Sequence, residues 1–446
     1  MGKSLAMEMD SSASELVLAR LVDRLAQVTG LAPEQFDLQA RDTLPPLVRW
    51  ARSGLMQLTG PSGGPPLLPS KDYAGRIAEL CALVRSLARA AGGELDPEPA
   101  LVAARATVAG LSRQGDVSAG GSCRILRTAD SHVAVNLARP SDLELLPAWI
   151  ECDEPPSWEA LQQTVASRDA RTLVEQGQLL GIPVALLGEA ADDTMPLRFT
   201  RMARTMAKRD ASRPLLVLDF SSLWAGPLCG QFLSRLGARV VKVESTQRPD
   251  GARSGPPAFF DMLHGGQEML AVDFRRPAEW ARLRGLMMKA DVIIEASRPR
   301  AFAQLGFAPA DIFRANPDLS WVSITGYGRD GPRNHRVGFG DDVAVAAGLV
   351  ELDAEGCPNF IGDAIADPIT GLAATAGVLA ALVAGGGYLV DAPMVAAASF
   401  VASAAPIADR STDGLTEALF APAITRPLSR AGDLGAHTEA LFRELG

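Results

Sequence analysis

Short apolar runs alternate with amphipathic stretches from residue 214 onward. The predicted strands are 215–220, 239–244, 291–295 and 319–325, and the predicted helices are 228–236, 280–289 and 309–315. The first helix ends at Gly237, and a strand–helix–strand unit with a glycine after the helix is typical of parallel sheets. Repetition of this unit predicts an α/β fold with a Rossmann-like, doubly wound parallel sheet over residues 214–446.

The first half of the chain is less regular. Its predicted helices are 11–29, 72–91, 158–166 and 170–180, and its predicted strands are 131–137 and 181–187. Residues 191–213 are polar and basic, which favours a linker. We therefore expect a helical segment at 1–110, a smaller α+β domain at 111–190, a linker at 191–213 and the Rossmann-like domain at 214–446.

One uncharged stretch, residues 368–390, is long enough to span a bilayer. It consists mainly of Ala and Gly, and three consecutive glycines at 385–387 would end a helix after about four turns. We therefore expect a buried helix followed by a strand, and no membrane partner. The acidic N-terminus lacks the apolar core of a signal peptide, so a cytoplasmic location is expected.

Composition excludes some classes of function. The net charge of −9 argues against nucleic acid as a partner, because such a surface needs a basic face. The five cysteines form no CxxC pair and have no nearby histidine, so neither a disulfide framework nor a metal site is expected.

The sequence also contains a degenerate internal repeat. Residues 53–104 parallel residues 347–398 in the order of a Gly-Leu motif, a helix, a glycine-rich turn and an Ala-rich segment. The preserved order over about fifty residues predicts two related structural units in one chain.

The motifs from residue 214 resemble those of family III CoA-transferases (CaiB/BaiF type), which include the α-methylacyl-CoA racemase branch. The resemblance is carried in order by VLDF…AGP (217–227), LGARVVKVE (236–244), DGAR (250–253), ADVIIEASRP (290–299) and SITGYGRDGP (323–332). The family's acyl-accepting aspartate precedes a long helix, and the matching segment here, IADPITGL (365–372), points to Asp367.

The resemblance implies an enzyme that moves CoA between carboxylic acids, with acyl-CoA and a carboxylic acid as its partners. Asp367 would form an aspartyl mixed anhydride and then an aspartyl-CoA thioester. The alternative is that Asp367, ahead of Pro368 at a helix start, is only a helix N-cap. Asp363 is the second candidate for the nucleophile.

Four residues are candidates for binding CoA. Trp224 and Ala225 lie in the turn where the family approaches the thioester, and Trp224 either lines the acyl pocket or belongs to the core. Arg253 and Arg298 are candidates for the phosphates, because strand ends form the ligand crevice of open α/β sheets. An exposed, solvated arginine is the alternative at each position.

The first half resembles the same family in rearranged order. Residues 54–104 resemble a worn copy of the catalytic-helix region, and residues 129–184 resemble the small domain, which usually follows the Rossmann-like part. In this degenerate copy, the position equivalent to Asp367 lies near Ala74. Since known relatives form interlocked homodimers, both a homodimer and an intrachain pseudo-dimer are expected arrangements.

Several positions depart from the family pattern. Ala296 and Ser297 stand where the family has Asn-Phe, and Gln267 stands near the place of a lysine. Phe339 stands where the racemase branch uses a histidine, which disfavours proton transfer at the α-carbon. Two alternatives to CoA transfer therefore stay open: a catalytically silent CoA-ester-binding or assembly subunit, and a racemase-like acyl-CoA enzyme.

Overall fold

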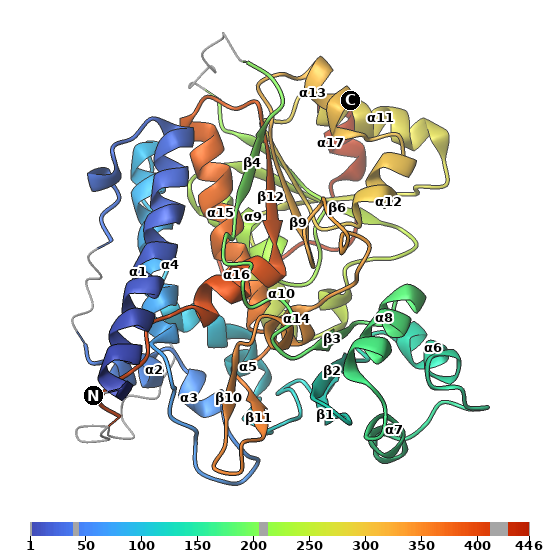
Figure 1. Cartoon of the computed structure of the whole chain (residues 1–446). Helices are drawn as coiled ribbons and strands as arrows, with labels where there is room; N and C mark the ends of the chain where they lie inside the picture. The colour runs from blue at the N-terminus through green and yellow to red at the C-terminus, as the bar shows by residue number, and fades with distance from the viewer. Residues whose placement is uncertain (1, 39–43, 205–212, 411–426, 446) are drawn as a thin grey trace.

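The main sheet of the computed structural model has seven strands in the order β4-β12-β9-β8-β5-β6-β7 (Figure 1). The structure describes residues 2–38, 44–204, 213–410 and 427–445. The strands are β4 (Arg198–Arg201), β5 (Leu216–Asp219), β6 (Arg239–Ser245), β7 (Glu268–Val272), β8 (Val292–Glu295), β9 (Ser320–Thr325) and β12 (Tyr388–Pro393). All neighbouring pairs are parallel except β4 with β12. The parallel sheet predicted from the sequence is therefore confirmed.

Helices cover both faces of this sheet. One face carries α9 (Ala225–Arg235) and α15 (Ala366–Val383), and the other carries α11 (Pro277–Met287), α12 (Pro299–Gln304), α13 (Pro309–Ala315) and α17 (Thr438–Leu445). Successive strand residues point to opposite faces, so Val217 joins the core under α9 and α15 while Leu218 joins the core under α11. The sheet is doubly wound, as its nearly continuous apolar strands predict.

The predicted linker, residues 191–213, is not simply a connection, and this part of the prediction is wrong. Residues 198–201 form β4, which pairs antiparallel with β12 at the edge of the main sheet. Only Phe199 of this strand is fully buried, so its apolar signal is a single residue among polar ones. Charged side chains on an edge strand are a common protection against pairing with other chains.

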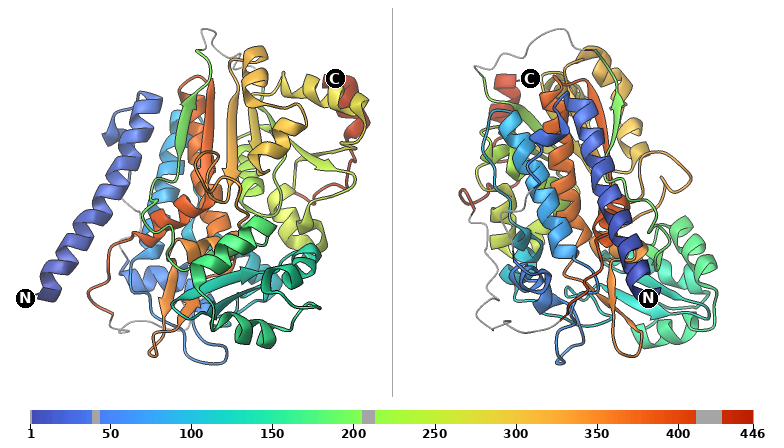
Figure 2. Two further views of the ribbon diagram at one scale, coloured as in Figure 1. Left: turned by 45° about the vertical axis from the view of Figure 1, so that its right-hand side comes forward. Right: turned by 60° about the vertical axis from the view of Figure 1, so that its left-hand side comes forward.

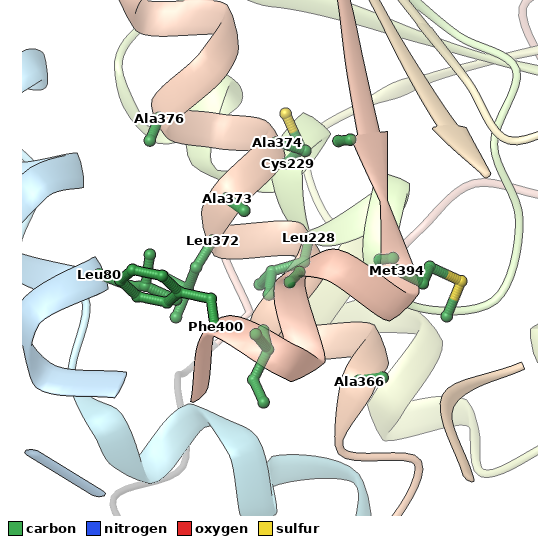
Figure 3. Close-up of a cluster of buried hydrophobic side chains, with 14 of the residues drawn as sticks. Leu80, Leu228, Cys229, Ala366, Leu372, Ala373, Ala374, Ala376, Met394 and Phe400 are labelled. Carbon is green, nitrogen blue, oxygen red and sulfur yellow. The ribbon is translucent and has the colours of Figure 1, made fainter. Parts of the chain in front are cut away.

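The long apolar helix α15 lies inside the protein. By length and composition it is the one helix among the described residues that meets the criterion for a membrane span, and 83% of it is buried. Figure 3 shows Leu80 of α4 and Phe400 of α16 on one side of α15, with Leu228 and Cys229 of α9 on the other. Small residues make this packing close: a side chain at Gly371 would meet the carbonyl oxygen of Ala225 at 2.8 Å. The predicted buried helix and following strand are confirmed.

The first half of the chain supplies a helical layer and a small domain. The helical layer contains α1 (Gly2–Thr29), α2 (Pro46–Arg52), α3 (Leu55–Leu58), α4 (Tyr73–Ala90) and α5 (Ala104–Ala109), and α1 and α4 both contact α15. The small domain is a three-stranded antiparallel sheet, β1 (Cys123–Arg127), β2 (His132–Asn136) and β3 (Val184–Leu186), with α6 (Pro140–Ile150), α7 (Trp158–Val165) and α8 (Ala170–Leu180). Figure 2 shows α1 along the outer side of the helical layer and the small domain at the opposite side of the molecule.

The remaining elements connect these layers. They are α10 (Pro257–His264), α14 (Gly340–Ala346), the hairpin of β10 (Val350–Leu352) and β11 (Pro358–Phe360), and α16 (Met394–Ala402). The short 3-10 helices are η1 (Pro33–Gln35), η2 (Pro99–Ala103) and η3 (Gly251–Ser254).

The two copies of the predicted repeat have comparable helices. Both α4 and α15 contain 18 residues, and Ala74 and Asp367 are each the second residue of their helix. The strand β12 has no counterpart after α4, where residues 94–98 form no strand. The two-unit origin of the chain stays a prediction.

Candidate active site

Asp367 lies in the first turn of α15, directly after a strained segment of backbone. Gly362 and Ala364 have φ angles of +74° and +45°, and the second value is rare for a residue with a side chain. The Ala364 N–H donates to Asp341 Oδ1 at 2.7 Å, which helps to hold this conformation. Strained backbone next to a partly exposed carboxylate is frequent at functional sites.

The Asp367 side chain does not cap its own helix. No side-chain cap is formed at the start of α15; instead, the Asp367 carboxylate accepts a hydrogen bond from the Gly340 backbone N–H. A side chain at position 340 would collide with Asp367 Oδ2 and with the Ala364 carbonyl oxygen. The N-cap alternative therefore finds no support, and glycine at 340 is what allows the close approach.

The carboxyl group of Asp367 is poorly solvated. Burial raises its pKa to about 7; the nearby Asp341 and Asp363 raise it further, whereas Arg105 and the Gly340 N–H lower it. Burial also raises the pKa of Asp341 to about 6 and that of Asp342 to about 7. Near neutral pH a large fraction of Asp367 is ionised, and its carboxylate carries little hydration.

Arg105 provides positive charge at the centre of these carboxylates. It comes from α5 in the first half of the chain, and its Nε and NH2 groups bond the two oxygens of Asp363 at 2.7 and 2.5 Å. Burial opposes the charge on Arg105, but Asp363, Asp341 and Asp367 raise its pKa. The first half of the chain thus completes the surroundings of Asp367.

Asp363, the second candidate for the nucleophile, has a different position. Its side chain is fully buried, and both oxygens are engaged by Arg105. Asp363 therefore orients Arg105, while Asp367 keeps a partly exposed side chain. Sequence reasoning missed Arg105, because it lies 258 residues before Asp363 in a stretch without a chemical motif.

The small domain holds the segment that carries Gly340. Asn136 Nδ2 donates to Asp342 Oδ1 at 3.0 Å, and the same oxygen accepts the Phe339 N–H at 3.0 Å. From α8, the Gln178 side chain exchanges two hydrogen bonds with the backbone of Val337. These bonds fix the backbone that donates to Asp367.

Trp224 and Ala225 lie where the sequence placed them, at the turn between β5 and α9. Trp224 is the residue preceding α9, it is 2% exposed, and its ring meets Phe259 edge-on at 5.2 Å. The Arg105 guanidinium lies 6.0 Å from the Trp224 ring centre, and the Ala225 carbonyl adjoins Gly371, one turn after Asp367. The predicted CoA-facing turn therefore adjoins the predicted nucleophile.

A buried charge network holds this turn. Leu223 has a φ angle of +72°, and its N–H donates to Asp250 Oδ1 at 3.0 Å. Lys242, fully buried, pairs with Asp250 at 2.9 Å and donates to the Ser221 carbonyl oxygen. Such a network gives the turn before Trp224 a single conformation.

The Arg253 side chain forms an ion pair and a ring contact within the protein. Its guanidinium pairs with Glu244 at 2.6 Å and lies 4.4 Å from the Phe260 ring centre. The pairing with Glu244 raises the Arg253 pKa. The CoA-binding role predicted for Arg253 stays a prediction.

Arg298 lies on a basic cleft between the main sheet and the small domain. The cleft has a volume of about 580 Å³, and it is also lined by Arg139 and His335. Burial, followed by repulsion from Arg139 and Arg248, lowers the Arg298 pKa. Arg139 pairs with the buried Asp142 at 2.5 Å, whereas Arg298 is exposed, so Arg298 is the better placed of the two arginines to meet an anionic ligand.

The residues that depart from the family pattern either contact other groups of the protein or are exposed. Gln267 bonds His264 Nδ1 at 2.9 Å and the Leu263 carbonyl at 3.0 Å. Ala296 is exposed, and the Ser297 N–H donates to Glu295. The Phe339 ring lies under the Arg139 guanidinium at 5.4 Å.

The sequence profile of CoA-transferase family III matches residues 214–418. Succinyl-CoA:glutarate CoA-transferase of Mus musculus is 31% identical over 191 residues, which are 40% of this chain and 44% of that protein. Succinyl-CoA–D-citramalate CoA-transferase of Chloroflexus aurantiacus is 30% identical over 191 residues, which are 40% of this chain and 47% of that protein. A "probable fatty acyl-CoA transferase" of Mycobacterium tuberculosis is 35% identical over 179 residues, 37% of this chain and 45% of that protein.

Solved structures align over a similar share. A Mycobacterium tuberculosis crystal structure, of the protein Rv3272, has a TM-score of 0.40 and 33% identity, and covers 43% of this chain and 56% of that one. The chain thus spans about half the length of the curated relatives it matches. Residues 224, 225, 253, 298 and 367 all lie within the matched region, whereas Arg105 and Arg139 lie outside it.

Proposed function

We propose, from the match of residues 214–418 to the sequence model of CoA-transferase family III, that the chain moves CoA between carboxylic acids with Asp367 as its nucleophile. The observation that carries the proposal is the Asp367 carboxylate: partly exposed, poorly solvated, and fixed by the Gly340 N–H at the start of α15. A carboxylate with little hydration has less solvation to lose when it attacks a carbonyl carbon.

The proposed first half-reaction consumes an acyl-CoA. An Asp367 oxygen attacks the thioester carbonyl carbon; the C–O bond forms, the C–S bond breaks, and CoA leaves as the thiolate. The thiolate then attacks the aspartyl carbonyl of the mixed anhydride and expels the donor carboxylate. Asp367 is left as an aspartyl-CoA thioester, and no electrons are gained or lost.

The second half-reaction reverses these steps with another acid. The acceptor carboxylate attacks the aspartyl-CoA thioester, the thiolate leaves, and it returns to the acceptor's carbonyl carbon in the new anhydride. The new acyl-CoA leaves and the Asp367 carboxylate is restored. Because each intermediate is sensitive to water, the reaction depends on a site that excludes it.

The neighbours of Asp367 have distinct roles in this scheme. Arg105 keeps a positive charge near the carboxylate and counters the repulsion from Asp341 and Asp363. The Gly340 N–H aims one Asp367 oxygen and leaves the other for attack. Preorganised groups of this kind stabilise charge without rearrangement during the reaction.

Arg298 and Arg139 are proposed to bind the phosphates of CoA. Both line the basic cleft beside the carboxyl ends of the parallel strands, where open α/β sheets bind ligands. Trp224 and Ala225 would contact the thioester arm, since their turn lies between β5 and α9 next to the helix of Asp367. No role in holding a metal is assigned to these residues.

Trapping the covalent enzyme tests the proposal. The protein is mixed with a panel of acyl-CoAs and hydroxylamine, and its peptides are analysed by mass spectrometry. We expect a hydroxamate confined to Asp367 and absent from Asp367→Asn, with Asp311→Asn, at a side chain that is 46% exposed, as the control that keeps labelling. Binding of CoA esters without modification of any carboxylate would instead favour a silent, CoA-ester-binding subunit.

A further inference from the structure

A second pocket, of about 460 Å³, lies between α9, α10 and the segment that follows α4. One face of α9 lines it with residues at helical spacing, namely Trp224, Leu228, Gln231, Phe232 and Arg235. The opposite wall includes Leu101 from the first half of the chain and Met262 from α10. The walls are therefore mainly apolar and come from both halves of the chain.

Two buried polar groups on this wall have no partner among the described residues. Gln231 is 2% exposed, and neither its amide nitrogen nor its amide oxygen is hydrogen-bonded. Trp224 Nε1 is likewise buried and unbonded. Because an unsatisfied buried polar group is costly, both point to a ligand that supplies hydrogen bonds.

The Trp224 end of the pocket adjoins the reaction centre. The Arg105 guanidinium lies 6.0 Å from the Trp224 ring centre, and Ala104, its neighbour in the chain, lines the pocket. Gln231 lies two turns further along α9, about 10 Å from Trp224. A ligand reacting near Trp224 would thus carry its hydrogen-bonding group some 10 Å from the reacting carbon.

The outer rim is acidic. Glu94, Asp96 and Glu98 are exposed there, with Arg235 as the cation on the same lining. Asp96 is already paired with Arg85 at 2.5 Å. A second carboxylate on a substrate would meet like charges at this rim, which disfavours dicarboxylic acids.

We propose that this pocket binds the chain of a neutral aliphatic acyl group that carries a hydroxyl or similar group within reach of Gln231. This inference rests on the proposed CoA transfer and names the class of acid. The apolar walls exclude water from the alkyl chain, Gln231 bonds its polar substituent, and the acidic rim rejects acids with a second charge.

Acceptor competition tests the inference. With an acyl-CoA donor that labels Asp367, kcat/KM is measured for octanoate, omega-hydroxyoctanoate and the dicarboxylate suberate. We expect the hydroxylated acid to exceed octanoate by about tenfold, and octanoate to exceed suberate by about tenfold. Gln231→Leu should remove the advantage of the hydroxyl, so that the ratio of kcat/KM for omega-hydroxyoctanoate to that for octanoate falls to about one.

A rim variant gives a second readout that does not disturb the core. Exposed Glu98→Lys should raise the suberate-to-octanoate ratio about tenfold, whereas Glu34→Lys, exposed and outside the pocket, should leave it unchanged. Equal use of octanoate and suberate, or ratios unchanged in both Gln231→Leu and Glu98→Lys, would overturn the inference while Asp367 labelling still stands. Absence of Asp367 labelling with every acyl-CoA would instead remove the proposed function itself.

Discussion

At the scale of single residues, the proposed chemistry depends on the protonation of Asp367. Its pKa, raised to about 7 by burial, keeps the proposed nucleophile partly protonated at neutral pH. Only the ionised form attacks a thioester, so kcat/KM should rise about tenfold per pH unit below pH 7 and level off above it. A pH series of the exchange reaction measures this midpoint.

Arg105 should set where that midpoint lies. Its positive charge lowers the Asp367 pKa, so Arg105→Gln is expected to move the midpoint to higher pH. Arg105→Lys keeps the charge and serves as the matched control, with a midpoint near that of the unchanged protein. If both variants leave the profile where it was, Arg105 does not act on Asp367 electrostatically.

Gly340 is a residue for which a single methyl group should decide activity. A Cβ at position 340 would occupy the space of Asp367 Oδ2, so Gly340→Ala must displace the carboxylate or the Ala364 carbonyl. We expect kcat to fall by at least about a hundredfold, as is typical when a nucleophile is misplaced. Gly285→Ala, in α11 with open space around the new methyl group, controls for the added methyl by leaving kcat nearly unchanged.

At the scale of elements, the turn at the start of α15 lowers stability at high pH, because it buries the Asp367 carboxyl group. A carboxyl whose folded pKa lies near 7 and whose unfolded pKa is near 4 holds its proton more tightly in the folded protein. Its contribution to stability is therefore full below about pH 4 and is lost as pH rises through about 7. The elements around Asp367 tolerate this loss because α15 is held by α4, α9 and α16.

Asp367→Asn should consequently be more stable than the unchanged protein at high pH. We expect its free energy of unfolding to be greater by on the order of 1–2 kcal/mol at pH 8 and nearly equal at pH 4. Urea unfolding at the two pH values measures the difference. A variant less stable at pH 8 would show that Asp367 is mainly a structural group.

At the scale of the whole molecule, the sequence predicted the layers better than the site. The strands β5, β6, β8 and β9 and the helix α15 could be recognised by their apolar runs and periodicity, whereas β7 was not among the predicted strands. The edge strand β4 could not be recognised in this way, because one buried phenylalanine among polar residues gives no alternating pattern. Asp367 followed from the family resemblance.

The surroundings of Asp367 could not be predicted, because they join distant parts of the chain. Arg105, Asn136 and Gln178 all come from the first half and reach the segments at 337–342 and 363. No local pattern marks an arginine that pairs with an aspartate 258 residues away. Long-range ion pairs become visible only when the packing of the two halves is known.

The joining of both halves also bears on assembly. One chain already supplies Asp367, Arg105 and Arg298, so a monomer is proposed to be competent as an intrachain pseudo-dimer. Light scattering identifies the protein concentrations at which the monomer predominates. The exchange activity per chain should be the same at those concentrations as at higher ones. Activity that disappears on dilution to monomer would assign the site to a homodimer instead.

The most direct measurement follows a heavy oxygen isotope from the acceptor acid into Asp367. In the proposed cycle the acceptor's oxygen bridges the second anhydride, and cleavage by the thiolate leaves that oxygen on the enzyme. After turnover with a labelled acceptor, the peptide containing Asp367 should gain one heavy oxygen, and no other carboxylate should gain any. Exchange of CoA without label in Asp367 would contradict the role of this residue as the covalent nucleophile.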